Sequence, residues 1–170
     1  RKIAFITGHP SLRAVGDRYL GYLDGLKQGG LELARRLVEN GDNSFGSGEA
    51  AANRLMTLED PPTAIFAAND DMAAGVIRAA ALLGVEVPGQ LSVAGCDDNS
   101  LARQLCPTLT TIRQPLSSMA ERAAQVLISN ASDESPLRGA EIISATIEIR
   151  ESTGPAPVET RTRRSRAQGL

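Results

Sequence analysis

Two short apolar segments of this sequence end abruptly at acidic or amide side chains. Residues 66–68 (Phe-Ala-Ala) run directly into 69–71 (Asn-Asp-Asp), and residues 93–96 (Val-Ala-Gly-Cys) run into 97–98 (Asp-Asp). In an open α/β sheet, ligands bind in the crevice outside the carboxyl ends of the strands. This pattern therefore predicts a small-molecule site at the carboxyl ends of two strands.

Segments with strand and helix patterns alternate along the chain, separated by glycine and proline residues typical of loops and turns. This alternation predicts an α/β fold, with an open, mostly parallel sheet and helices on both of its faces. Residues 31–40 fit either a helical continuation or an extended connection. The strands are expected at residues 2–7, 63–68, 91–95, 109–112 and 140–149, and the helices at 16–28, 46–58, 70–83 and 116–129.

The composition indicates a single globular domain and argues against several classes of function. A chain of 170 residues with 42% hydrophobic content can bury a core of its own. The net charge of -2 argues against an extended basic surface, so the chain by itself is not expected to grip DNA. No apolar run reaches the roughly 18 residues that span a bilayer.

The cysteine and histidine content favours a reducing compartment. Cys96 and Cys106 are too few for a disulfide framework, and His9 is the only histidine. We therefore expect a cytoplasmic protein with no metal site and no cofactor. From Glu151 onward the chain becomes rich in Pro, Thr and Arg, which predicts disorder.

Six motifs follow one another in an order and spacing that resemble a known family. They are Arg-Tyr-Leu-Gly-Tyr (18–22), Ala-Asn-Asp-Asp-Met-Ala-Ala-Gly (68–75), Gly-Val-Glu-Val-Pro (84–88), Ser-Val-Ala-Gly-Cys-Asp-Asp (92–98), Pro-Thr-Leu-Thr-Thr-Ile-Arg-Gln-Pro (107–115) and Arg-Glu-Ser-Thr (150–153). Together they resemble the effector-binding core of the LacI/GalR (lactose repressor) family of bacterial transcription regulators. The resemblance covers about residues 2–154 and implies a periplasmic-binding-protein-like (type I) subdomain.

The resemblance also implies a domain organisation. Family members have a helix-turn-helix, a hinge helix and two α/β subdomains that close on a ligand. By this resemblance, residues 1–154 are mainly the C-terminal subdomain with a crossover segment at 115–138, and 155–170 are a disordered tail. The helix-turn-helix and most of the N-terminal subdomain are then absent from this chain. The arginine-rich run at 161–166 is either a weak binder of nucleic acid or acidic surfaces, or a solvated tail.

The family packs its crossover helix in the other subdomain. The corresponding helix here, 116–129, is therefore expected to have an apolar face that is exposed, repacked or paired with another copy. That face consists of Met119, Ala120, Ala123, Val126 and Leu127.

Three residues are candidates for direct ligand contact. Arg18 lies where the family places an arginine that grips sugar hydroxyls or a carboxylate, although a surface arginine is the alternative. Asp97 can accept hydrogen bonds from adjacent hydroxyls, and otherwise it is a loop or cap aspartate. Asn69 can bind a ligand, cap the following helix, or do both. Asp98 is expected to bond to the local backbone instead.

Four further residues are candidates for lining the cleft. The family usually has an aromatic residue at the position of Asn43, and Phe45 nearby could substitute for it. Cys96 replaces an aromatic residue that commonly precedes the aspartate pair, and it is otherwise a buried apolar filler. His9 lies either at the cleft mouth or in an ordinary surface loop.

The helix at 70–83 has too many apolar positions for one core-facing stripe. The resemblance implies that this helix and the region 101–109 form a homodimer interface, while burial inside the fold is the alternative. The interface candidates are Met72, Val76, Ile77, Ala80, Leu101 and Leu105.

These observations predict the ligand-sensing and dimerisation region of a LacI-type transcriptional regulator. A small sugar-like effector would bind in the interdomain cleft and control DNA binding by the missing head. Weak or absent affinity is expected from a single wall of the cleft. The alternative is a solute-binding protein of a sugar transport system. An enzyme is not expected, because Asp70 and Asp71 lack a nucleophile, a histidine partner and a metal set.

Overall fold

The structure is a computed structural model that describes residues 2–129 and 140–156. In this part of the chain, six strands form one sheet in the order β2-β1-β3-β4-β5-β6. Strands β1 to β5 pair in parallel, and β6 pairs antiparallel with β5, so the predicted mostly parallel sheet is confirmed. The strands are β1 (Ile3–Thr7), β2 (Val38–Asn40), β3 (Ala64–Ala67), β4 (Ser92–Asp97), β5 (Thr110–Arg113) and β6 (Thr146–Glu148).

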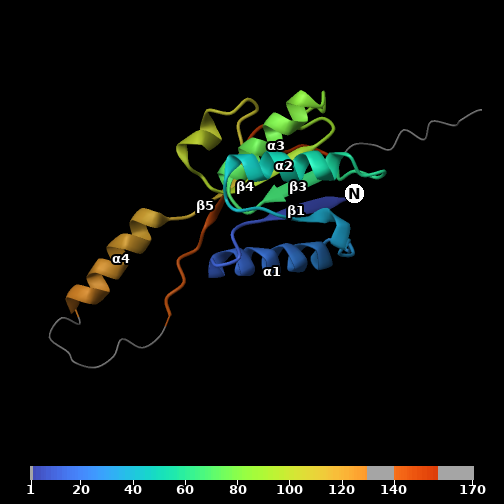
Figure 1. Cartoon of the computed structure of the whole chain (residues 1–170). Coiled ribbons are helices and arrows are strands. Elements are labelled where there is room, and N and C mark those ends of the chain that lie inside the picture. Colours follow the sequence, from blue (N-terminus) through green and yellow to red (C-terminus); the bar gives the residue numbers. More distant parts are fainter. Residues whose placement is uncertain (1, 130–139, 157–170) are drawn as a thin grey trace, which may run out of the picture.

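Helices cover both faces of this sheet, as the alternation of elements predicted (Figure 1). Helix α1 (Arg13–Gln28) lies on one face, and α2 (Phe45–Met56) and α3 (Asp70–Leu82) lie together on the other. Short 3-10 helices, η1 (Arg35–Leu37) and η2 (Ser100–Arg103), interrupt the loops after α1 and after β4.

Strand β1 lies at the centre of the core. Ala4, Phe5 and Ile6 have no exposed surface, because helices cover the strand from both sides. The ring of Phe5 stacks on Tyr22 of α1 with a centroid distance of 5.0 Å. Because the hydroxyl of Tyr22 also donates to the carbonyl of Ile3 at 2.8 Å, this packing fixes α1 against β1.

Helices α2 and α3 approach each other closely because two glycines lie at their contact. A Cβ atom at Gly48 would lie 2.2 Å from the backbone oxygen of Met72, and one at Gly75 would lie 2.1 Å from the backbone oxygen of Phe45. Helix α3 is therefore enclosed by α2 on one side and by the sheet on the other. Its buried residues are Asp70, Met72, Ala73, Ala74, Gly75, Val76, Ile77, Ala79 and Ala80.

The ambiguous segment at 31–40 ends as an edge strand. Val38 pairs with Phe5 and Asn40 pairs with Thr7, while η1 precedes the strand. The extended alternative therefore holds for the last three residues. Local propensity could not decide between a helical and an extended conformation here, because an edge strand depends largely on pairing with the neighbouring strand.

The C-terminal part differs from the sequence-based expectation in two ways. The strand expected at 140–149 is limited to β6, because only this part pairs with β5. The disorder predicted from Glu151 onward is wrong for the first residues of that segment. Ser152 is fully buried, its hydroxyl donates to the carbonyl of Val93 at 2.6 Å, and it accepts from the amide of Thr110 at 2.8 Å. The expected tail at 157–170, with its arginine-rich run, lies outside the described residues.

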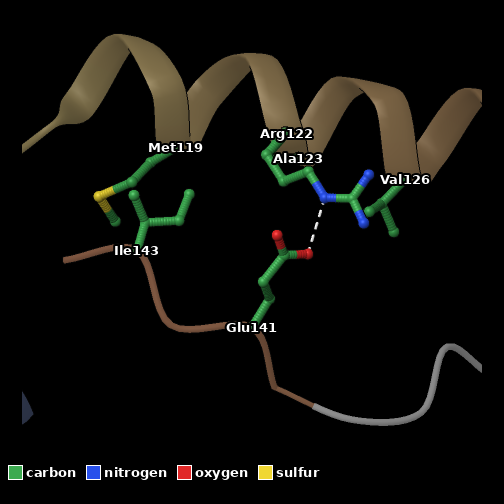
Figure 2. A pocket seen from close by; sticks show the side chains of 6 residues that line it. All are labelled: Met119, Arg122, Ala123, Val126, Glu141 and Ile143. Carbon is green, nitrogen blue, oxygen red and sulfur yellow. Dashed lines mark hydrogen bonds and ion pairs between the residues drawn. The ribbon is translucent and has the colours of Figure 1, made fainter.

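Helix α4 (Leu116–Ser129) extends away from the sheet body (Figure 1). None of its described residues is buried, so the exposed alternative holds for most of its apolar face. A groove of about 240 Å³ separates it from the returning chain, and Arg122 donates to Glu141 across it at 2.7 Å (Figure 2). The remainder of the predicted crossover segment, 130–138, lies outside the described residues. The groove is lined by Met119, Arg122, Ala123, Val126, Glu141 and Ile143.

Among the described helices, none is long and apolar enough to cross a membrane.

Candidate functional site

Arg18 and Asp97 meet at the carboxyl edge of the sheet. Arg18 extends from α1, and its guanidinium donates to the carbonyl of Ala68 at 2.6 Å and to Oδ1 of Asp97 at 3.3 Å. The two side chains are 21% and 34% exposed, so they are partly desolvated but still open to a ligand. The two residues predicted to bind hydroxyl groups of the ligand, one as a donor and the other as an acceptor, therefore lie side by side. Whether they bind a ligand stays a prediction.

Gln114 is a third member of this cluster that the choice of ligand residues missed. Its Nε2 donates to Oδ1 of Asp97 at 2.7 Å, so one carboxylate oxygen is shared by Gln114 and Arg18. The register of β4 and β5 places Asp97 opposite Arg113, and Gln114 is the next residue. Because parallel strands end at the same edge, that pairing could have pointed to Gln114.

The environment of Asp97 opposes its ionisation in part. Burial raises the pKa of its carboxyl, while Arg18 and the hydrogen bond from Gln114 act in the opposite direction. Its backbone lies at φ 134, in the region that L side chains rarely adopt. The strand end is therefore held in an unusual conformation that turns this side chain toward Arg18 and Gln114.

Asn69 caps helix α3, as one of its two interpretations required. Its Oδ1 accepts from the amide of Met72 at 2.9 Å, and its Nδ2 donates to the carbonyl of Asn43 at 2.9 Å. The side-chain amide therefore links two loops at the carboxyl edge. A ligand contact of Asn69 stays a prediction.

Asn43 and Phe45 lie at the start of α2. Asn43 has φ 73, a left-handed conformation that asparagine tolerates, and its buried Oδ1 has no hydrogen-bond partner among the described residues. Phe45 is half-exposed at the first turn of α2. The hydrogen bond from Asn69 ties the backbone of Asn43 to the residue that follows the carbonyl of Ala68, to which Arg18 donates. A ligand contact of Asn43 or Phe45 stays a prediction.

His9 and Cys96 lie differently with respect to the cluster: His9 is in an exposed loop, whereas the thiol of Cys96 adjoins Asp97 and Arg18. His9 is exposed, and its Nδ1 lies 2.7 Å from the hydroxyl of Ser11, which fits the surface-loop alternative. Cys96 is buried, and burial raises the pKa of its thiol to about 11. Because the thiolate is the reactive form, the raised pKa leaves the Cys96 thiol protonated at neutral pH, and its role in lining the cleft stays a prediction.

Asp98 corrects the sequence-based assignment. Its carboxylate does not bond to the local backbone but accepts hydrogen bonds from Arg113 at 2.6 Å, from Arg103 at 2.8 Å and from Arg150. Its side chain is only 1% exposed. Burial alone would raise the pKa of Asp98, but the three arginines outweigh burial and lower it to about 2. The carboxylate is therefore ionised and fully paired.

Asp70 is structural, as the sequence indicated. It is fully buried, where its carboxylate accepts from the hydroxyl of Thr111 at 2.5 Å and from the amide of Asn99 at 2.9 Å. Burial raises its pKa, and the hydrogen bonds from Thr111 and Asn99 counteract this effect. Asp70 thus connects the start of α3 to β5 and to the loop after β4. In the described ranges, no group of His, Cys, Asp and Glu side chains is arranged to hold a metal.

The residues chosen for a dimer interface divide into two groups. Met72, Val76, Ile77 and Ala80 are buried within the chain itself, because α2 and the sheet enclose α3. The alternative of burial inside the fold therefore corrects the choice of these four, which have almost no surface to offer a second copy. Leu101 and Leu105 are only half-buried, and their interface role stays a prediction. Other exposed apolar side chains of this region are Leu82 and Leu83.

An open, mostly parallel sheet with Arg18, Asp97 and Gln114 clustered at its carboxyl edge defines a ligand-binding subdomain of the periplasmic-binding-protein type. The model of the periplasmic binding protein-like domain family matches residues 1–153. The chain belongs to this family.

The similar proteins are regulators of the LacI/GalR type. The chain is 35% identical to the probable repressor ExuR of Bacillus subtilis, over 77% of this chain and 39% of ExuR. It is 32% identical to the regulator GalR of Escherichia coli, over 93% of this chain and 46% of GalR. It thus spans less than half the length of these curated relatives.

A solved structure agrees with these relatives. A sugar-binding transcriptional regulator of the LacI family from Escherichia coli, complexed with phosphate, matches with a TM-score of 0.82 and 32% identity. The match covers 91% of this chain and 55% of that one. The resemblance in the sequence motifs is therefore confirmed. Because these relatives are transcriptional regulators, they agree with the prediction that the site is not catalytic.

Proposed function

We propose that this chain is the ligand-sensing and dimerisation region of a LacI-type transcriptional regulator in the cytoplasm. Its effector is a small sugar or sugar derivative that binds between this subdomain and a second one. Binding changes the angle between the subdomains and thereby the DNA affinity of a head outside this chain, through different effector affinities of two states. The observation that carries the proposal is the Asp97 carboxylate shared by Arg18 and Gln114.

The chemistry of this cluster fits a polyhydroxylated ligand. Arg18 and Gln114 both donate to Oδ1 of Asp97, and a carboxylate can accept a further hydrogen bond from a ligand hydroxyl at its second oxygen. The guanidinium fork of Arg18 can donate to a second hydroxyl or to a carboxylate on the same ligand. Adjacent donors and acceptors of this kind match neighbouring hydroxyl groups of a sugar, and the sugar-binding description of the solved relative supports the same class.

The transport alternative uses the same fold for the same class of ligand. A solute-binding protein of a sugar transport system would also present polar side chains at a carboxyl edge. The regulator function is favoured because ExuR, GalR and the solved relative are all described as transcriptional regulators or repressors.

Saturation-transfer NMR with a panel of monosaccharides, disaccharides and sugar acids tests effector binding. We expect weak binding of one class, and a loss of about 10-fold or more in affinity for Asp97→Ala, because a hydrogen bond to a charged group is removed. Arg78→Ala on the outer side of α3 is the matched control, since Arg78 is exposed and only its pairing with Glu49 is lost. Binding that Asp97→Ala leaves unchanged would contradict the proposed site.

Light scattering over a concentration series tests the homodimer. We expect a concentration-dependent dimer that Leu105→Glu weakens, because Leu105 is half-buried next to η2 and a charge there would be desolvated on association. Ile142→Glu, on the exposed returning chain, serves as the control. A monomer at all concentrations would contradict dimerisation by this region alone.

A further inference from the structure

The buried carboxylate of Asp98 accepts hydrogen bonds from three arginines, close to the start of α4. Asp98 accepts from Arg103 of η2, from Arg113 at the end of β5 and from Arg150, which follows β6. Arg150 also donates to the carbonyl of Leu109 at 2.7 Å. Since the chain leaves the sheet after β5 and returns through β6, Asp98 holds both connections of the crossover to the end of β4.

The same carboxylate lies one residue from the candidate ligand site. Asp97 and Asp98 have φ 134 and φ 54, so the strand end turns and the two side chains diverge to different partners. The amide of Asp98 also donates to the hydroxyl of Thr111 on β5 at 3.4 Å, at the long end of the hydrogen-bond range. Asp97 therefore faces Arg18 and Gln114, while Asp98 faces the other three arginines, at positions 103, 113 and 150.

Arg113 connects the two groups of contacts. It is held by Asp98 through Nε at 2.6 Å and by Glu148 of β6 through a second nitrogen at 3.1 Å. Gln114 is the next residue, and its Nε2 reaches Asp97 at 2.7 Å. The backbone that presents Gln114 is thus fixed immediately before it, and Pro115 follows immediately after it.

We propose that Asp98 is a positioning residue of the ligand site, which acts through Arg113 to hold Gln114 against Asp97. The inference rests on the proposed function, because it assigns the shared Asp97 oxygen to effector binding. A glutamine side chain loses considerable rotamer freedom when it is fixed, so a rigid strand end lowers that cost before a ligand arrives. Binding sites in general require the support of such surrounding contacts to keep their geometry.

The experiment follows the Gln114 side-chain amide by 15N-edited NMR in the absence of any effector. The wild-type signal is assigned by its loss in Gln114→Ala. In Asp98→Asn we expect the chemical shift of this amide to move toward the value for a free glutamine and its exchange with water to accelerate. Arg113→Gln should have the same effect, and it serves as a second route if Asp98→Asn does not fold. Arg103→Gln is the matched control, because Arg103 binds Asp98 from η2 and does not precede Gln114.

A double-mutant cycle separates positioning from direct electrostatics. The Asp97 pKa is measured by 13C NMR in wild type, Asp98→Asn, Gln114→Ala and the double variant. Removal of the Asp98 charge acts directly on Asp97, alongside Arg18, Asp70 and Asp71, whether or not Gln114 is present. Release of Gln114 raises the Asp97 pKa. We therefore expect Asp98→Asn to raise the Asp97 pKa more, or to lower it less, in the wild-type background than in the Gln114→Ala background.

Two results would overturn the inference. One is an unchanged Gln114 amide in a folded Asp98→Asn or Arg113→Gln variant, which would make Asp98 a structural ion pair only. The other is an equal change of the Asp97 pKa in both backgrounds. Neither readout involves an effector, so failure of the sugar-binding panel, which tests the proposed function, remains distinguishable from failure of this inference.

Discussion

Helices α3 and α4 have similar lengths, and each has apolar residues at helical spacing, although α3 has more of them. Most of α3 is buried, whereas no described residue of α4 is. Met72 of α3 has no exposed surface, and Met119 of α4 is 44% exposed. An apolar stripe therefore shows only that a helix can be buried. Whether it is buried depends on the strands and helices that pack against it.

The difference arises from the partners that each helix meets. Helix α3 packs between the sheet and α2, and the contact requires glycine at positions 48 and 75. Within the described ranges, helix α4 faces the returning chain across the groove that includes Met119 and the ion pair between Arg122 and Glu141 (Figure 2), and none of its residues is buried. Four sets of variants test this difference between the two helices and the contacts around them.

The largest expected effect comes from the same substitution in both helices. Met72→Ala should destabilise the fold by about 2–5 kcal/mol, because it removes a fully buried side chain and leaves a cavity. Met119→Ala should change stability by less than about 0.5 kcal/mol, because its side chain is largely solvated. Urea denaturation measures both. Equal losses for the two variants would show that α4 is buried in solution.

A smaller effect is expected from glycine substitutions. Gly75→Ala should cost about 1–3 kcal/mol, because the added Cβ would overlap the backbone of Phe45 and α2 would have to shift. Helix α4 contains no glycine, so the open control is Gly21 of α1, where no atom lies near an added Cβ. Gly21→Ala should stabilise the chain by about 0.4–1 kcal/mol. A neutral Gly75→Ala would contradict the close contact of α2 and α3.

The third effect is a loss of stability at acidic pH, which we expect to originate at Asp98, near the start of α4. The arginines lower the pKa of Asp98 to about 2 from an ordinary value near 3.8. A carboxyl with a lowered pKa stabilises the folded state above its unfolded pKa, and this contribution is lost as the pH falls through about 4 toward about 2. Asp70 acts in the opposite sense, because burial raises its pKa and protonation favours the folded form.

Urea midpoints measured over this acidic range test the role of Asp98. Asp98→Asn should be less stable than wild type near neutral pH and should lose less stability on acidification. Hydrogen exchange should locate the acid effect in Arg113 and Gln114 before it reaches α3. A pH dependence in Asp98→Asn identical to that of wild type would exclude Asp98 as its source.

The smallest effect is expected across the groove beside α4. Glu141→Gln removes the ion pair with Arg122, and both side chains are about half-exposed. Exposed ion pairs contribute little, so the change in unfolding free energy should stay below about 0.5 kcal/mol. Differential scanning calorimetry at low and high salt measures it. A loss above 1 kcal/mol would indicate that the returning chain packs on α4 more firmly than its exposure suggests.

Much of the fold was predictable because its signals are local. Helix α4 has the predicted bounds, and Asn69 caps α3 at the predicted place. The edge strand β2, the shortened β6 and the buried Ser152 were not predictable from local pattern, since each depends on pairing with a distant strand or carbonyl. Short segments of weak propensity adopt the conformation that such partners select.

The site was predictable at the level of residues but not of contacts. Arg18 and Asp97 were chosen from their chemistry and motif context, and in the structure a guanidinium nitrogen of Arg18 lies 3.3 Å from Oδ1 of Asp97. Gln114 and the arginines around Asp98 were missed. They lie 5 to 52 positions from their aspartates along the sequence. The sheet register brings Gln114 to Asp97, while Arg103 reaches Asp98 from η2.

Local sequence signals were enough to predict the class of fold, most of its strands and helices, and the polar side chains at the ends of β3 and β4. These features follow from periodicity, capping and turn residues that act within a few positions. The assembled fold decided how deeply each apolar helix is buried, that Gln114 joins Arg18 at Asp97, and that three arginines pair with Asp98. The physical reason is that burial and ion pairing depend on partners distant in sequence, whose approach is fixed only when the sheet assembles.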